Sequence, residues 1–97
     1  MPTATIKHMR GLEVHLNGDK LCTAGINSDA ALNAAVDVIG RETDYEMTVR
    51  VGGLADNEFV IWSDRELRVG DEISIKIVET ETSDTPERRN PHATSET

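Results

Sequence analysis

Residues that could hold a metal ion or act as a nucleophile are few in this chain and widely separated. His8, His15 and Cys22 follow one another at intervals of seven residues, which matches none of the usual zinc-binding spacings, and no Cys-x-x-Cys pair is present. His15 and Cys22 could share an ion if they lay on neighbouring strands of one hairpin. We favour the alternative that His15 is a solvated strand residue and Cys22 a small buried hydrophobic side chain. The sequence therefore predicts no metal site.

The groups needed for catalysis or for binding a phosphate are also missing from the sequence pattern. Cys22 has only Lys20 as a nearby positive residue, so its thiolate form gains little support. Neighbouring acids such as Asp71 and Glu72 occupy turn or strand positions that usually face water. There is no Gly-x-Ser-x-Gly element and no glycine-rich loop followed by lysine. We therefore predict no catalytic residues, no cofactor and no enzymatic activity.

The charge of the chain is −8, from eighteen acidic and ten basic residues. It disfavours binding to nucleic acid or to anionic lipid, because contacts to phosphate require clustered Lys and Arg. The same charge leaves open a different role, in which an inhibitor of a DNA- or RNA-binding enzyme mimics nucleic acid. No apolar segment has the length of a membrane span, and the N-terminus lacks a signal-peptide core. A single cysteine excludes an internal disulfide and favours the reducing cytoplasm.

Alternation of apolar and polar residues predicts most of the secondary structure as strands. Leu12, Val14 and Leu16 alternate with Glu13 and His15, the pattern of a half-buried strand. The Asn-Gly pair that follows is a strong hairpin signal, because both residues tolerate positive φ. Alternation predicts strands at residues 12–16, 45–51 and 73–77; residues 20–26 are predicted as the returning strand of the hairpin, and the apolar run of residues 59–62 as a short strand.

One main helix is predicted over residues 30–39. Its apolar residues fall at i, i+3, i+4 and i+7, which places them on one helical face. These residues are Leu32, Ala35, Val36 and Ile39. Residues 27–29 are suitable N-caps, and Gly40 is suited to end the helix. A capping box over residues 63–66 predicts one further helical turn before the last strand.

The C-terminal part of the chain contains few apolar residues from Thr80 onward. Such a segment buries too little apolar surface to offset its ordering entropy. We therefore predict a single domain over residues 1–79 and a disordered acidic tail over residues 80–97. The predicted fold is α+β, with a mixed sheet of four to five strands packed on the one main helix.

This arrangement resembles the β-grasp, or ubiquitin-like, fold, and in particular the small sulfur-carrier proteins of thiamine and molybdopterin biosynthesis. The resemblance is carried by residues 14–19, by Trp62 before Leu67, and by the Val-Gly-Asp-Glu-Ile run of residues 69–73. It covers roughly residues 12–78. Those carriers act through a C-terminal Gly-Gly, whereas the only Gly-Gly pair here is Gly52-Gly53 in mid-chain. No functional residue of the family is therefore carried over.

Two surfaces remain as candidates for binding a protein. With a helix on one face of the sheet, the other face would present a polar set of both charge signs, including His15, Arg50 and Lys76. The second candidate is Trp62 with Arg65 and Arg68, since Trp and Arg are enriched at binding hot spots. The alternatives are a merely solvated sheet face and a Trp62 that closes one end of the core. The predicted protein-binding residues are His15, Arg50, Trp62, Arg65, Arg68 and Lys76.

The function predicted from these features is that of a non-enzymatic protein-binding module, such as an adaptor, regulator or inhibitor. A protein partner is expected, without nucleic acid or membrane. We expect the chain to be a monomer or a weak dimer, because an unpaired strand at a sheet edge can pair with a second copy. A protein related to sulfur carriers and an acidic mimic of nucleic acid are the alternatives.

Overall fold

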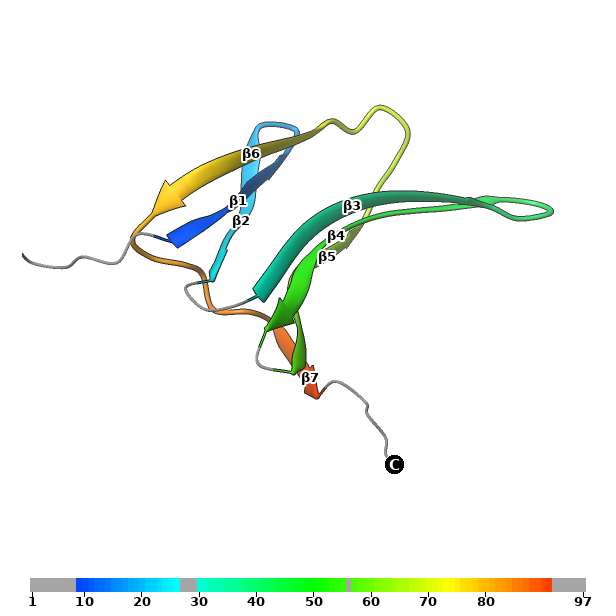
Figure 1. Ribbon diagram of the computed structural model, residues 1–97. Helices are drawn as coiled ribbons and strands as arrows, with labels where there is room; N and C mark the ends of the chain where they lie inside the picture. Colours follow the sequence, from blue (N-terminus) through cyan, green and yellow to red (C-terminus); the bar gives the residue numbers. More distant parts are fainter. Residues whose placement is uncertain (1–8, 27–29, 56, 92–97) are drawn as a thin grey trace, which may run out of the picture.

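The computed structural model describes residues 9–26, 30–55 and 57–91, and these residues form β-strands without any helix. The strands are β1 (Met9–Leu16), β2 (Asp19–Ile26), β3 (Ala30–Gly40), β4 (Tyr45–Ala55), β5 (Glu58–Glu66), β6 (Ile73–Thr80) and β7 (Arg88–Pro91). They make two antiparallel sheets (Figure 1). The first sheet has the order β2-β1-β6, and the second has the order β3-β4-β5-β7.

The prediction of an α+β, β-grasp-like fold is therefore wrong, and the protein is all-β. The predicted main helix is β3, which pairs with β4 along its whole length from Ala30↔Ala55 to Gly40↔Tyr45. The segment has a second periodicity of two, with Leu32, Ala34, Val36 and Val38 on one face. Its β-branched residues favour a strand once a partner strand is available. The N-caps proposed at residues 27–29 lie outside the described residues.

The predicted helical turn at residues 63–66 is also wrong, because these residues continue β5. Val51 pairs with Ser63 and Gly52 pairs with Ile61, so Trp62 is an extra residue in the ladder between β4 and β5. Such a β-bulge bends a strand and changes the direction of its side chains. Trp62 and Ser63, although adjacent, are consequently both buried.

The predicted hairpin at Asn17-Gly18 is confirmed. Both residues have positive φ, 53° and 88°, as a two-residue type I′ turn requires. Asn17 Nδ2 also donates a hydrogen bond to Asp71 Oδ1 (3.0 Å), and Arg68 N donates to Asp71 Oδ2 (2.7 Å). These two hydrogen bonds lower the pKa of Asp71 and tie the loop before β6 to the hairpin.

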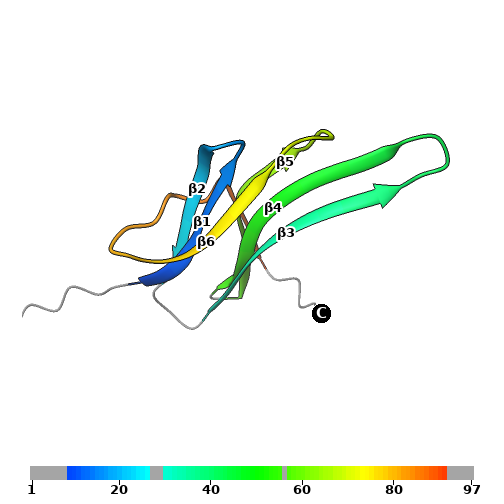
Figure 2. The same cartoon turned by 90° about the horizontal axis from the view of Figure 1, so that it is seen from above.

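The two sheets pack face to face and enclose a small core. The first sheet contributes Val14, Cys22 and Ala24, and the second contributes Val51, Ala55, Val60 and Trp62. The hairpin of β3 and β4 extends well beyond this core (Figure 1, Figure 2). The molecule is accordingly flat and elongated, with extents of 62 × 43 × 16 Å.

The segment after β6 differs from the disordered tail predicted for it. It crosses from the first sheet to the second, and the backbones of Thr23 and Asp84 are joined by a hydrogen bond from Asp84 N to Thr23 O (2.9 Å). Thr23 N in turn donates to the Asp84 carboxylate (2.8 Å). Residues 88–91 then pair with β5 as β7. Residues 92–97 of the predicted tail lie outside the described residues.

No helix in the described part of the chain has the length and apolarity needed to cross a membrane.

Candidate protein-binding site

The inner face of β6 is largely uncovered. Val14 pairs directly with Ile75, and Leu12 pairs with Ile77, so these four side chains point to the same face of the first sheet. Val14 is completely buried in the core, but Ile75 is 46 % exposed and Ile77 is 79 % exposed. The second sheet therefore covers β1 and leaves its neighbour β6 open.

The hairpin of the second sheet is uncovered in the same way. Val36 pairs with Val49, and Ala34 pairs with Val51, which places all four on the face that carries the core. Val49 and Val51 are buried, whereas Val36 is 49 % exposed. Val38, two residues further along β3, is 64 % exposed. The inner face of β3 thus carries aliphatic side chains, Val36 and Val38, that the first sheet does not cover.

These two uncovered faces lie on the same side of the molecule. Between the two sheets, β1 contacts β3, and β2 contacts β3, β4 and β5. Because β6 follows β1 on the side away from β2, it lies beyond the edge formed by β3. Figures 1 and 2 show the edge strands β6 and β3 along one side, with β2 and β5 further back. We call this region the open side; it is formed by Val36 and Val38 of β3 and by Ile75 and Ile77 of β6.

The backbone of β3 adds a second binding feature to the open side. As an edge strand it leaves one row of N–H and C=O groups without a strand partner in the described sheet. Edge strands are usually protected by Lys, Pro or several charges. β3 is eleven residues long and its only charged residue is Asp37. It is therefore suited to pair with a further strand.

No protein-family model, curated protein or solved structure matches this chain.

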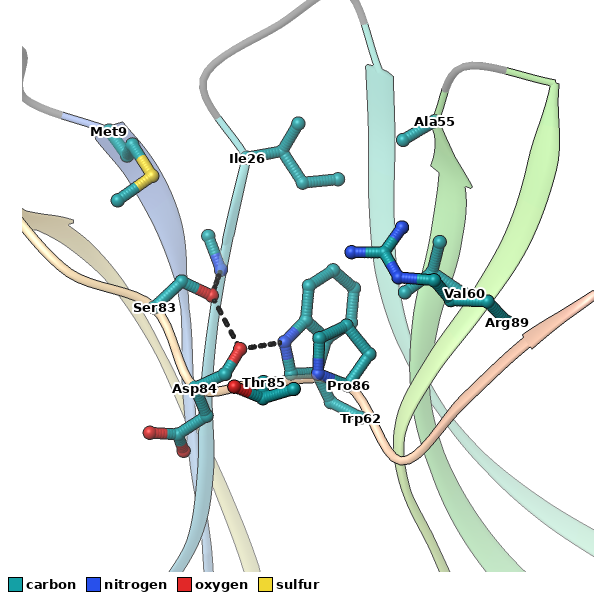
Figure 3. A pocket seen from close by; sticks show the side chains of 11 residues that line it. Met9, Ile26, Ala55, Val60, Trp62, Ser83, Asp84, Thr85, Pro86 and Arg89 are labelled. Atoms are coloured by element: carbon teal, nitrogen blue, oxygen red, sulfur yellow. Dashed lines mark hydrogen bonds between the residues drawn. The ribbon is translucent and has the colours of Figure 1, made fainter.

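A pocket of about 330 Å³ lies at the end of the sandwich, where residues 83–86 between β6 and β7 line it (Figure 3). Trp62 lines it but is only 5 % exposed, and its indole Nε1 donates a hydrogen bond to Asp84 O (2.8 Å). Arg89, also at the pocket, is paired with Glu58 (3.2 Å). Trp62 therefore closes one end of the core and offers little surface to a partner.

The polar residues predicted as one binding face are divided between opposite sides of the sandwich. His15 lies on the outer face of the first sheet, 3.3 Å from a Glu13 carboxylate oxygen. Lys76 is on that face too, because it pairs with Glu13. Arg50 is on the outer face of the second sheet, where it contacts Asp64 (3.4 Å). The structure thus brings His15 and Lys76 together but separates Arg50 from them.

The two arginines predicted beside Trp62 do not extend a tryptophan surface. Arg65 pairs with Val49 and so projects from the inner face of the second sheet, where its side chain is exposed. Arg68 is exposed in the loop after β5, and its backbone N–H is bound by Asp71. The residues of the open side were missed because a helix was expected to cover the sheet. The alternation at residues 73–77 identified a strand but carried no information about what covers it.

Cys22 and His15 cannot share a metal ion in this fold. Cys22 pairs with Val14 and points into the core, whereas His15, the next residue of β1, points to the opposite face. Within the described residues no cluster of three His, Cys, Asp or Glu side chains could hold a metal. His8 lies outside those residues.

The thiol of Cys22 is expected to react slowly with alkylating reagents. Burial, together with the negative charges of Asp84 and Glu87, raises its pKa from 9.0 to about 11. At pH 8 this lowers the thiolate fraction by about 100-fold relative to the unfolded chain. Mass spectrometry should show iodoacetamide modifying Cys22 at least about 100-fold more slowly in buffer than in urea. Similar rates under both conditions would show that Cys22 is accessible.

Proposed function

We propose that this protein is a non-enzymatic protein-binding module that acts as an adaptor, regulator or inhibitor through its open side. The observation that supports this most directly is the exposure of Val36, Val38, Ile75 and Ile77 on inner faces of the sandwich. Side chains on these faces normally form a core, and contiguous exposed apolar surface is a common mark of an interaction site.

The chemistry of the open side favours a polypeptide strand as ligand. A strand placed beside β3 would form main-chain hydrogen bonds with the edge, and its alternate side chains would contact the apolar residues of β3 and β6. Each aliphatic side chain covered in this way contributes about 25 cal/mol per Å² of apolar area removed from water. The backbone edge therefore supplies register, and the aliphatic residues supply affinity.

Two further observations are consistent with this proposal. The thiol of Cys22 is buried and its raised pKa keeps it protonated at neutral pH, which suits a packing role rather than that of a nucleophile. On the outer faces His15 lies 3.3 Å from Glu13 and Arg50 pairs with Asp64, so these polar side chains have partners within the chain. We place the protein in the cytoplasm, in keeping with a single buried thiol.

Replacing Ile77 by Lys is the test of this function. Ile77 is 79 % exposed in the free protein, so Ile77→Lys should leave the fold intact while placing a charge in the interface. We expect at least a tenfold loss of partner binding, since burying an unpaired charge costs more than about 1.4 kcal/mol. Binding is measured by retention of cellular protein on the immobilised chain and then by titration of the purified partner.

The matched control is Leu54→Lys, a similar change on the opposite surface. Leu54 is 39 % exposed. It lies on the outer face of β4, because side chains alternate along a strand and the adjacent Ala55 is buried on the inner face. We expect this variant to bind like the wild type. Equal binding by Ile77→Lys and the wild type would exclude the open side as the docking surface.

A further inference from the structure

We infer that the partner at the open side is a second copy of this chain, bound by antiparallel pairing of β3 with β3 of the copy around a two-fold axis. This inference rests on the proposed function and specifies its partner. It follows from three features of the open side: the position of β6, the pattern of β3, and the charge along the edge.

The position of β6 favours a strand beside β3. Because β6 lies beyond the β3 edge, a strand added to that edge would lie opposite β6 and cover Ile75 and Ile77. In a two-fold dimer this strand is β3 of the copy, and its inner face carries Ala34, Val36 and Val38. The same operation covers the equivalent residues of the copy, as an isologous interface requires.

The free edge of β3 has a definite hydrogen-bonding pattern. At the hairpin end Arg41 N donates to Asp44 O (2.8 Å), so the odd-numbered residues of β3 direct their backbone groups toward β4. The even-numbered residues, among them Ala34 and Val36, therefore direct theirs toward the free edge. The backbone groups available to a second copy thus belong to the residues whose side chains form the apolar inner face.

One register fits both the length and the side chains of β3. The midpoint of Ala30–Gly40 is Ala35, so an axis through Ala35 pairs the strand with its copy over the full length. This register places Ala34 opposite Val36 on the inner face. On the outer face it places Asp37 opposite Asn33, so the only charge of β3 meets an amide rather than another carboxylate.

The inferred interface runs along the whole of β3. A strand of eleven residues spans roughly 37 Å at about 3.4 Å per residue. The four residues of the open side each expose between 46 and 79 % of their surface. Specific interfaces bury roughly 800 Å² per partner, so the dimer needs the whole backbone edge of β3 in addition to these side chains. The net charge of −8 on each chain opposes association, so the dimer should tighten as salt screens that repulsion.

Disulfide trapping of the full-length chain tests the register. In the inferred dimer the two Ala35 residues face each other as a non-hydrogen-bonded pair with a Cα separation of about 4.5 Å, which a disulfide can bridge. We expect Ala35→Cys to give a covalent dimer under mild oxidation. Asp37→Cys is the control, because the two Asp37 residues would lie roughly 14 Å apart, four residues along the strand. It should cross-link at least tenfold less.

Sedimentation at increasing concentration, in low salt and in about 0.5 M NaCl, tests the edge itself. We expect the wild type and Leu54→Lys to be dimeric. Val36→Pro removes one N–H that faces the free edge and keeps the bonds to β4, a position where edge strands tolerate Pro. It should raise the dimer dissociation constant at least 30-fold. If circular dichroism shows this variant unfolded, the trapping of Ala35→Cys against Asp37→Cys decides alone.

The outcomes separate this inference from the proposed function. If the wild type is monomeric but binds a different protein, and Ile77→Lys loses that binding, the inference of a second copy is wrong and the proposed binding function stands. A dimer that traps Ala35→Cys no better than Asp37→Cys would place self-association on another surface and also overturn the inference. A monomer that binds no protein at all would contradict both the inferred dimer and the proposed binding function.

Discussion

Trp62→Ala should lower the free energy of unfolding by about 3–5 kcal/mol, the usual loss when a large aromatic side chain is removed from a core. Trp62 is 5 % exposed and belongs to the core cluster that includes Val14 of the first sheet and Val60 of the second. Its removal also leaves Asp84 O without the indole N–H that binds it at 2.8 Å. Small domains have a total stability of about 5–15 kcal/mol, so this variant should be close to unfolding at room temperature.

Urea denaturation followed by circular dichroism measures this loss, because the substitution removes the chain's one tryptophan and with it the fluorescence signal. Trp62→Phe is the matched control. It keeps most of the apolar bulk and loses the hydrogen bond, so we expect a smaller loss, about 1–2 kcal/mol. A loss below about 1 kcal/mol in Trp62→Ala would mean that Trp62 is not the plug of the core.

Gly53→Ala should lower the free energy of unfolding by about 2–3 kcal/mol, although it adds a single methyl group. A Cβ at Gly53 would overlap Ala31 O on the neighbouring strand, and it would lie 3.1 Å from Ala31 C and 3.2 Å from Leu32 Cα. These atoms belong to the backbone of β3, so no side-chain rotation can relieve the contact. The strand must instead move away from β4, which should also weaken binding at the open side.

Gly25→Ala is the control for this prediction, since Gly25 is a buried glycine in a strand as well. A Cβ there would meet Ser83 Cβ and Thr80 Cγ2, both at 3.5 Å, and Met9 Cβ at 3.7 Å, which are ordinary contact distances. Its effect should range from no change to a gain of about 1 kcal/mol from the lower entropy of the unfolded chain. Thermal and urea unfolding of the two variants side by side give the difference. Equal stabilities would indicate that β3 adapts to the added methyl group.

Local interactions explain the parts of the fold that the sequence predicted correctly. The hairpin at Asn17-Gly18 depends on the φ preferences of two adjacent residues, and such preferences do not require a partner from elsewhere. The alternation at residues 73–77 likewise lies within β6. In both cases the information resides in neighbouring residues, so the pattern and the structure agree.

Segment 30–40 shows why the fold class could not be obtained in this way. Leu32 and Val36 belong to a helical stripe and also to one face of a strand. The segment is a strand because β4 pairs with it over its whole length. Local propensity is a weak preference that tertiary pairing overrides. The same holds for Asp84, whose backbone and carboxylate bind Thr23 across sixty-one positions of sequence.

By itself the sequence determined that the chain is acidic, that one Asn-Gly turn closes a hairpin, and that residues 12–16, 45–51 and 73–77 alternate as strands. Only the tertiary structure decided that Trp62 is buried, that Arg50 is separated from His15, and that Ile75 and Ile77 face an open side. The physical reason is that exposure depends on which distant strand covers a face. Ile75 and Val14 have the same strand pattern, and only the position of the second sheet distinguishes them.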